Sequence, residues 1–186
     1  MILRDHNEFY IEHGTKRKGW FNSKSKVFDK GKKDRRRKAV YATELEAERL
    51  SAFGFIPICD GELYKYLIAS VIDIIVTKDE YVEWFGSTSL LIKFSKSRDR
   101  SRAWINAIEF ATRDKVSMFD IYHELAHTVT LRNTEPNHGE RFLSAYLLIA
   151  SLSPFDNHAQ HLVRQLNKRR LYPLNNTYLL RELDYH

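Results

Sequence analysis

Apolar and polar residues alternate along the chain with two different spacings. Helical spacing is present in AVYATELEAERLSAF (39–53), and a second helix is expected over residues 61–70. Strand-like segments are the β-branched run VIDIIVT (71–77), SLLIKFS (89–95) and AWINAIEFAT (103–112). Strands followed by helices predict an α+β domain.

Three further segments with helical spacing follow these strands. They begin at Met118, Glu140 and about Asn157, and Pro154 separates the last two. The expected helices end near Thr130, Leu152 and Arg170. The sequence therefore predicts a small sheet packed on a group of C-terminal helices.

Charge and composition suggest three regions of the chain. Residues 1–38 are expected to be a basic N-terminal arm or loop, residues 39–172 a globular domain, and residues 173–186 a tail. Between Lys16 and Lys38 there are twelve Lys or Arg residues and two acids, a net charge of +10 in a chain whose total is +6. The rest of the chain is therefore slightly acidic, and the basic character belongs to the arm.

The cysteine content and the lengths of the apolar runs bear on the cellular location. Cys59 is the single cysteine, so an internal disulfide is excluded and a reducing compartment is expected. No apolar run approaches the roughly 20 residues that span a bilayer. We therefore expect a cytoplasmic protein without a membrane partner.

The segment that begins at Met118 places histidines and apolar residues on different sides of one helix. At 100° per residue, His123 and His127 lie nearly opposite the apolar stripe, and Glu124 lies beside them. The stripe consists of Met118, Ile121, Tyr122, Leu125 and Val129. Two imidazoles one turn apart can bind one ion, which is the physical basis of the HExxH motif. The alternative is a solvent-facing histidine pair on an ordinary helix.

Asp120 allows two interpretations. Ser117 precedes the apolar run and Asp120 follows three residues later, the spacing of a capping box. The carboxylate of Asp120 could instead orient a metal-binding imidazole. Capping is the favoured interpretation of this residue.

A hydrolytic zinc site needs a third protein ligand, and His138 is the candidate. The ten residues between His127 and His138 end in turn formers, and Gly139 then permits a tight approach before a new helix. Glu135 is a weaker alternative because it lies early in the connection. The sequence therefore predicts one zinc ion bound by His123, His127 and His138.

These motifs resemble those of a known group of enzymes. HELAH followed by HGERF is similar to the HExxH…HGxxF/W pattern of SprT-like zinc metallopeptidases, and the match is closer to small bacterial and phage metallohydrolases with a Val-Tyr-Ala-x-Glu helix upstream. KDRRRKAVYATE (33–44) resembles that upstream segment, with Lys33 in place of an expected arginine. The resemblance covers roughly residues 33–170.

The resemblance implies a fold, a set of ligands and a role for Glu124. The fold would be a minimal zincin with a small, mostly antiparallel sheet whose edge strand lies beside the metal, and 103–112 is the candidate edge strand. Zinc would be bound by the three histidines, and Glu124 would be the general base. The resemblance also implies a protein or peptide substrate.

The chemistry of the residues agrees with hydrolysis of an amide bond. Neutral imidazole ligands leave zinc its full charge, which lowers the pKa of a bound water to about 7 so that Glu124 can remove its proton. No oxyanion donor is identifiable. Candidates by position are Tyr146, His158, His161 and Arg164, and for each of them a packing or surface role is the favoured interpretation. His6, His13 and His186 are expected to be solvated.

The basic arm supports a second hypothesis about function. Its cations are interspersed with Trp20, Phe21 and Phe28, a mixture that can neutralise phosphates and stack on bases. The candidate nucleic-acid-binding residues are Lys32, Lys33, Arg35, Arg36, Arg37 and Lys38. The alternative to a hydrolase is therefore a module that binds nucleic acid or protein through the arm and carries a structural or vestigial zinc site. For the arm itself, a solvated segment without a partner is the slightly favoured interpretation of this composition.

Overall fold

The protein is described by a computed structural model, in which the chain forms an α+β fold. The structure describes residues 2–5, 8–13, 34, 36–51, 61–86, 88–96, 100–111, 116–130, 138–155 and 157–173. The strands in these residues are β1 (Ile2–Asp5), β2 (Glu8–His13), β3 (Thr88–Ser95), β4 (Arg102–Trp104) and β5 (Ala107–Ala111). The helices are α1 (Arg37–Leu50), α2 (Gly61–Val76), α3 (Asp79–Phe85), α4 (Met118–Thr130), α5 (Glu140–Ser151) and α6 (His158–Lys168).

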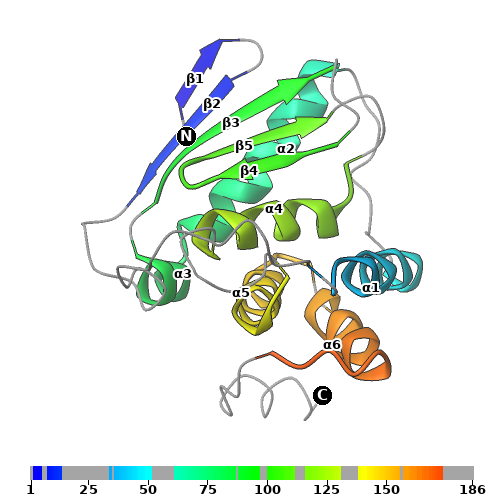
Figure 1. Cartoon of the computed structure of the whole chain (residues 1–186). Coiled ribbons are helices and arrows are strands. Elements are labelled where there is room, and N and C mark those ends of the chain that lie inside the picture. The colour runs from blue at the N-terminus through cyan, green and yellow to red at the C-terminus, as the bar shows by residue number, and fades with distance from the viewer. Residues whose placement is uncertain are drawn as a thin grey trace.

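The strands form one mixed sheet in the order β1-β2-β3-β5-β4 (Figure 1). Strands β3 and β5 are parallel, and the other three neighbouring pairs are antiparallel. The expectation of a small, mostly antiparallel sheet agrees with this arrangement. Among the described strands, β4 is the last in the order, so one of its edges has no strand partner.

Side chains alternate across the sheet, and one face is apolar. In β3 and β5 the buried residues are Leu90, Ile92, Phe94, Ile108 and Phe110. Helix α2 packs against β2 and β3, and α4 packs against β4 and β5. Period-two burial of this kind specifies strand register, because a one-residue slip would move every apolar side chain to the opposite face.

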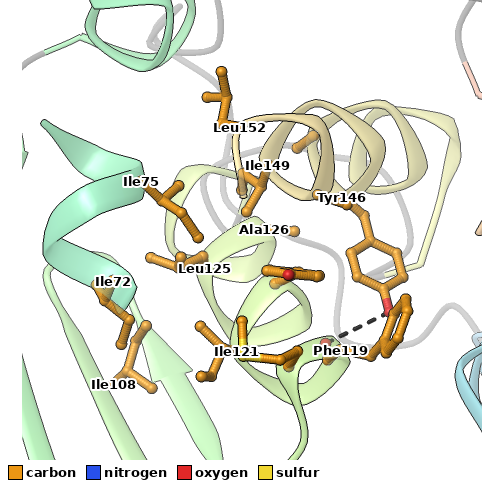
Figure 2. Packing of buried hydrophobic residues seen from close by; sticks show 14 of the residues in the cluster. Ile72, Ile75, Ile108, Phe119, Ile121, Leu125, Ala126, Tyr146, Ile149 and Leu152 are labelled. Carbon is orange, nitrogen blue, oxygen red and sulfur yellow. Dashed lines mark hydrogen bonds between the residues drawn. The ribbon is translucent and has the colours of Figure 1, made fainter. Parts of the chain in front are cut away.

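Helix α4 is packed between the sheet and a second layer of helices. Figure 2 shows Ile121 and Leu125 of α4 among Ile72, Ile75 and Ile108 from α2 and β5, while α5 covers the other side of the helix. Helix α1 contacts α4 and α6, and α6 also contacts α5. Fully burying one such side chain stabilises the fold by about 1.5–3 kcal/mol. The helix that carries the HExxH motif is therefore largely buried between the sheet and the other helices.

The predicted strand 71–77 is wrong, because these residues continue a single helix from Gly61 to Val76. Ile72 and Ile75 are completely buried, whereas Ile74 between them is 45% exposed. This spacing is helical, and burial against the sheet and α4 outweighs the β-propensity of the branched side chains. Helix α3, which directly follows, had no counterpart in the expected elements.

The predicted single strand 103–112 is a hairpin. Trp104 of β4 pairs with Ala107 of β5, so Ile105 and Asn106 form the turn. Strand β5 lies inside the sheet between β3 and β4, so of the two strands of the hairpin it is β4 that lies at an edge of the sheet. The candidate edge strand is thus corrected to its first part, and Figure 1 shows β4 as the strand next to α4.

The start of the chain also differs from the expectation of an arm or loop. Strands β1 and β2 lie in residues 2–13, and Phe9 and Ile11 of β2 are buried against the sheet's apolar neighbours. Residues 14–33, which contain most of the basic arm, and residues 174–186 of the expected tail lie outside the described residues.

Most of the other expected elements are confirmed. Strand β3 corresponds to residues 89–95, and α1, α4, α5 and α6 correspond to the four remaining helices within a few residues at each end. Within the part of the chain that the structure describes, no helix has the length and apolar character to cross a membrane.

Candidate metal centre

Helix α4 begins with a capping box. The backbone N–H of Ser117 donates to Oδ2 of Asp120 at 2.9 Å, and the backbone N–H of Asp120 donates to Oγ of Ser117 at 2.9 Å. Two of the amides at the helix start are thereby paired. Of the two interpretations of Asp120, these hydrogen bonds favour the cap. The carboxylates that are hydrogen-bonded to the histidine rings are those of Glu44 and Asp34.

The three predicted ligands converge on one point. Nε2 of His127 lies 2.9 Å from Nε2 of His123, and Nε2 of His138 lies 3.3 Å from the same atom. One ligand atom from each ring lies within 4.8 Å of the other two. Two nitrogens bound to one zinc at 2.0–2.1 Å with a tetrahedral angle would be about 3.3 Å apart. The three rings therefore lie close enough together to hold one metal ion.

His138 reaches this point from a different part of the chain than the helical pair. It lies directly before Gly139, the N-cap residue of α5, and α5 packs along α4. The interpretation of His138 as the residue that starts a helix packed against the first is confirmed. Within the helical pair, His123 is 3% exposed and His127 is half-buried, which excludes a solvent-facing histidine pair.

Two carboxylates orient the rings from behind. Nδ1–H of His123 donates to Glu44 of α1, and Nδ1–H of His138 donates to Asp34, which precedes α1. A carboxylate accepts hydrogen bonds only, so each Nδ1 carries the proton and each Nε2 presents its lone pair to the shared point. Carboxylate–histidine pairs of this kind fix the tautomer of a metal ligand.

The electrostatics of the cluster favour a cation at that point. Burial lowers the pKa of His123, but Glu44, Glu124 and Asp120 together raise it to about 8. Burial and the neighbouring rings hold the pKa of His127 well below its usual range. The pKa of His138 is also lowered, chiefly by burial. Facing lone pairs repel each other unless a proton or a metal ion lies between them, so the cluster is a built site for positive charge.

Two aromatic side chains enclose the cluster. The ring of Phe142 lies 5.0, 4.6 and 4.8 Å, centroid to centroid, from the rings of His123, His127 and His138. Tyr41 of α1 stacks on His123 at 5.4 Å with the planes 10° apart. These contacts restrict ring rotation and exclude water from part of the site.

Glu124 lies beside the cluster with a nearly buried carboxylate. Glu124 is 9% exposed, and it lines a cleft of about 890 Å³. Burial raises the pKa of Glu124, with Asp120 and Glu44 adding to the rise and His123 opposing it, to about 7. A carboxylate with a pKa near the working pH suits a general base that must also release the proton.

The candidate oxyanion donors lie in the packing around the site. The hydroxyl of Tyr146 donates to the carbonyl of Phe119 at 3.5 Å, as the dashed line in Figure 2 shows. Nδ1 of His158 is hydrogen-bonded to the hydroxyl of Tyr122 at 2.8 Å. His161 and Arg164 lie on α6 and do not line the cleft. Packing therefore accounts for the positions of Tyr146 and His158, whereas His161 is half-buried and Arg164 is a surface residue.

The candidate nucleic-acid-binding residues are only partly described. Arg36 contacts Glu140 at 3.5 Å, and Arg37 and Lys38 line the cleft beside Glu124. The other candidates, Lys32, Lys33 and Arg35, lie outside the described residues. The alternative ligand Glu135 and the histidines His6 and His186 also lie outside them. Only the backbone of His13 is described.

Sequence reasoning did not identify Asp34, Tyr41, Glu44 or Phe142 as parts of the site. A signal for Glu44 existed, because it lies on the buried stripe of α1 with Val40, Thr43 and Ala47. A carboxylate on an apolar stripe must find a partner, since burying it alone is costly. Asp34, Tyr41 and Glu44 all fall within the segment 33–44 that carried the family resemblance.

Comparisons of the chain with protein-family models, with curated proteins and with solved structures found no match. The capacities of the site are therefore inferred from its own residues and their geometry.

Proposed function

We propose that this protein is a zinc-dependent hydrolase of the peptidase class, with a minimal zincin-like domain. His123, His127 and His138 are the proposed ligands, and Glu124 is the proposed general base. The observation that carries the proposal is the convergence of three Nε2 atoms, each from a buried or half-buried ring, beside a nearly buried carboxylate.

A zinc ion bound there would supply Lewis-acid chemistry, lowering the pKa of water and polarising a carbonyl. The chain's own residues have separate tasks. Glu44 and Asp34 keep the Nε2 lone pairs of His123 and His138 directed inward. Glu124 accepts a proton from the attacking water and returns it to the leaving amine nitrogen.

The position of β4 supports a polypeptide substrate. The strand lies next to α4, and its outer edge has no partner among the described strands. An extended peptide can pair with such an edge through its backbone, and its carbonyl groups would then lie near the cleft that Arg102 and Glu124 line. The cleft that contains Glu124 is lined at its other side by the beginning of β4 and the end of β5.

The number of ligands favours a catalytic site over a structural or vestigial one. A structural zinc site has four protein ligands, whereas a catalytic site has three and leaves one position for water or substrate. The described residues bring three ligating side chains together. A hydrolase also requires a general base, and Glu124, which is adjacent to the cluster and lines a cleft, is the proposed one.

Replacing Glu124 with glutamine tests this proposal. Zinc content should remain at one ion per chain, while peptide hydrolysis should fall by about 10²–10⁴-fold, the usual contribution of a general acid–base. Glu83→Gln, an exposed position on α3, is the matched control and should retain activity. Unchanged turnover in the Glu124 variant would reject the mechanism, and a wild-type protein that binds no zinc would reject the site.

A further inference from the structure

The cleft beside Glu124 is strongly cationic. Arg37 and Lys38, at the start of α1, line one side of it, and Arg100 and Arg102, at the start of β4, line another. All four residues are exposed. Two segments more than sixty positions apart in the sequence thus bring four positive charges to a single cleft.

Two acidic residues, Asp120 and Glu124, also line the cleft. Asp120 accepts the hydrogen bond from the backbone N–H of Ser117, and Glu124 lies next to His123 with 9% exposure. None of the four cations forms an ion pair with a carboxylate within the described ranges. Positive charges lining a concave surface concentrate the field there and attract anions.

We propose that this cleft selects polypeptide segments that carry acidic side chains beside the bond to be cleaved, a specificity that rests on the hydrolase function proposed above. The cleft volume of about 890 Å³ is in the range of pockets that hold a small ligand, and so it accommodates a few side chains. Carboxylates of the substrate would contact Arg100 and Arg102 from the β4 side and Arg37 and Lys38 from the α1 side.

The outer edge of β4, which has no strand partner among the described residues, favours a peptide over a nucleic acid as the occupant. Arg102 is itself the first residue of that strand, so the cations and the backbone groups available for pairing lie together. A peptide can use both features at once, through main-chain hydrogen bonds and side-chain ion pairs. A nucleic acid would use the cations and leave the strand edge unpaired.

Binding of matched peptides to the zinc-loaded full chain carrying Glu124→Gln tests the inference without turnover. The probes are fluorescent decapeptides with blocked ends that contain glutamate, glutamine or lysine at the same positions, and anisotropy gives the dissociation constants. The glutamate peptide should bind roughly fivefold to tenfold more tightly than the glutamine peptide, because two or more partly screened ion pairs form. Adding R100Q and R102Q together should reduce this preference below about twofold. R102K alone, with Arg100 unchanged, keeps both positive charges and should retain the preference.

Arg164→Gln, an exposed position on α6, is the control and should leave the preference unchanged. Equal affinities for the three peptides would overturn the inference. So would displacement of the glutamate peptide by a short oligothymidylate that depends on Arg100 and Arg102, because the cleft would then be a nucleic-acid site. Hydrolysis by the wild-type chain separates the two proposals: equal kcat/KM for all three peptides removes the specificity alone. Absence of hydrolysis with a retained binding preference removes the hydrolase function alone.

Discussion

Glu44 of α1 holds His123 of α4 by a hydrogen bond to Nδ1, across 79 positions of sequence. Both side chains are nearly buried, at 9% and 4% exposure. Through this hydrogen bond α1 fixes the orientation of the His123 ring on α4. The other ring nitrogen, Nε2, is left available to bind a cation. The orientation of the proposed metal site therefore depends on how α1 packs against α4.

Substituting Glu44 should weaken metal binding while Glu124 remains in place. Glu44→Gln keeps the size of the side chain but removes the charge, so the ring of His123 loses basicity and orientation. Zinc affinity should fall by about 10–100-fold, the usual cost of losing a carboxylate behind a histidine ligand. Competition with a chromophoric chelator measures it, and Glu46→Gln on the same helix, whose side chain is paired with Arg49, serves as control. Equal affinity in the Glu44 variant and the wild type would contradict the role.

Removing the third ring should open the site. His138→Ala leaves two histidines on α4, which is too few for a stable catalytic zinc site. Zinc content by elemental analysis should fall from one ion to well below one per chain after dialysis, and added zinc should no longer raise the melting temperature. His161→Ala on α6 removes a histidine that does not contribute to the cluster. A His138 variant that keeps one tightly bound zinc would show that another residue is the third ligand.

The helical conformation of residues 71–76 predicts a contrast between neighbouring substitutions. Ile72 is completely buried and Ile74 is 45% exposed. Ile72→Ala should lower the free energy of unfolding by about 2–5 kcal/mol, whereas Ile74→Ala should change it by about 0.5 kcal/mol or less. Chemical denaturation measures both. In a strand the two side chains would share one face, so similar losses from both variants would argue against the helix.

His158 should make stability depend on pH in the acidic range. Burial, with His161 adding to the effect, lowers the pKa of His158 to about 4, below its ordinary value of 6.5. The unfolded chain therefore takes up a proton at this residue below pH 6.5 while the folded chain does not, and stability falls as the pH drops from about 6.5 to 4.

His158→Gln removes this titration. Denaturation curves in the presence of a chelator should show a shallower loss of stability for the variant between pH 6.5 and 4, by up to one proton, and parallel behaviour between pH 7 and 8. The other histidines titrate in both proteins, so their contributions cancel. The same slope in both proteins would indicate that the pKa of His158 is close to its ordinary value.

The elements that were predicted correctly are those whose signals are local. Helix α4 has an apolar stripe, and Ser117 and Asp120 form its cap, so its start could be read from consecutive residues. Its HExxH spacing places His123 and His127 one turn apart in any helix. His138 followed from the turn formers before it and the helix after it.

The errors occurred where tertiary burial outweighed local preference. Residues 71–77 are rich in β-branched side chains, and only the apolar surfaces of the sheet and α4 make a helix the better arrangement for Ile72 and Ile75. The hairpin of β4 and β5 was read as one strand because Ile105 and Asn106 are not strong turn formers. The strands β1 and β2 were missed because neighbouring basic residues dominated the composition of that region.

By itself, the sequence determined the helix, the three converging histidines and the glutamate beside them, since each depends on residues close together in the chain. Tertiary structure alone decided that Glu44 and Asp34 orient the rings, and that Arg37, Lys38, Arg100 and Arg102 line the cleft of Glu124. The reason is physical: these contacts join segments far apart in the chain, and their geometry exists only once the helices and the sheet have buried their apolar faces against one another.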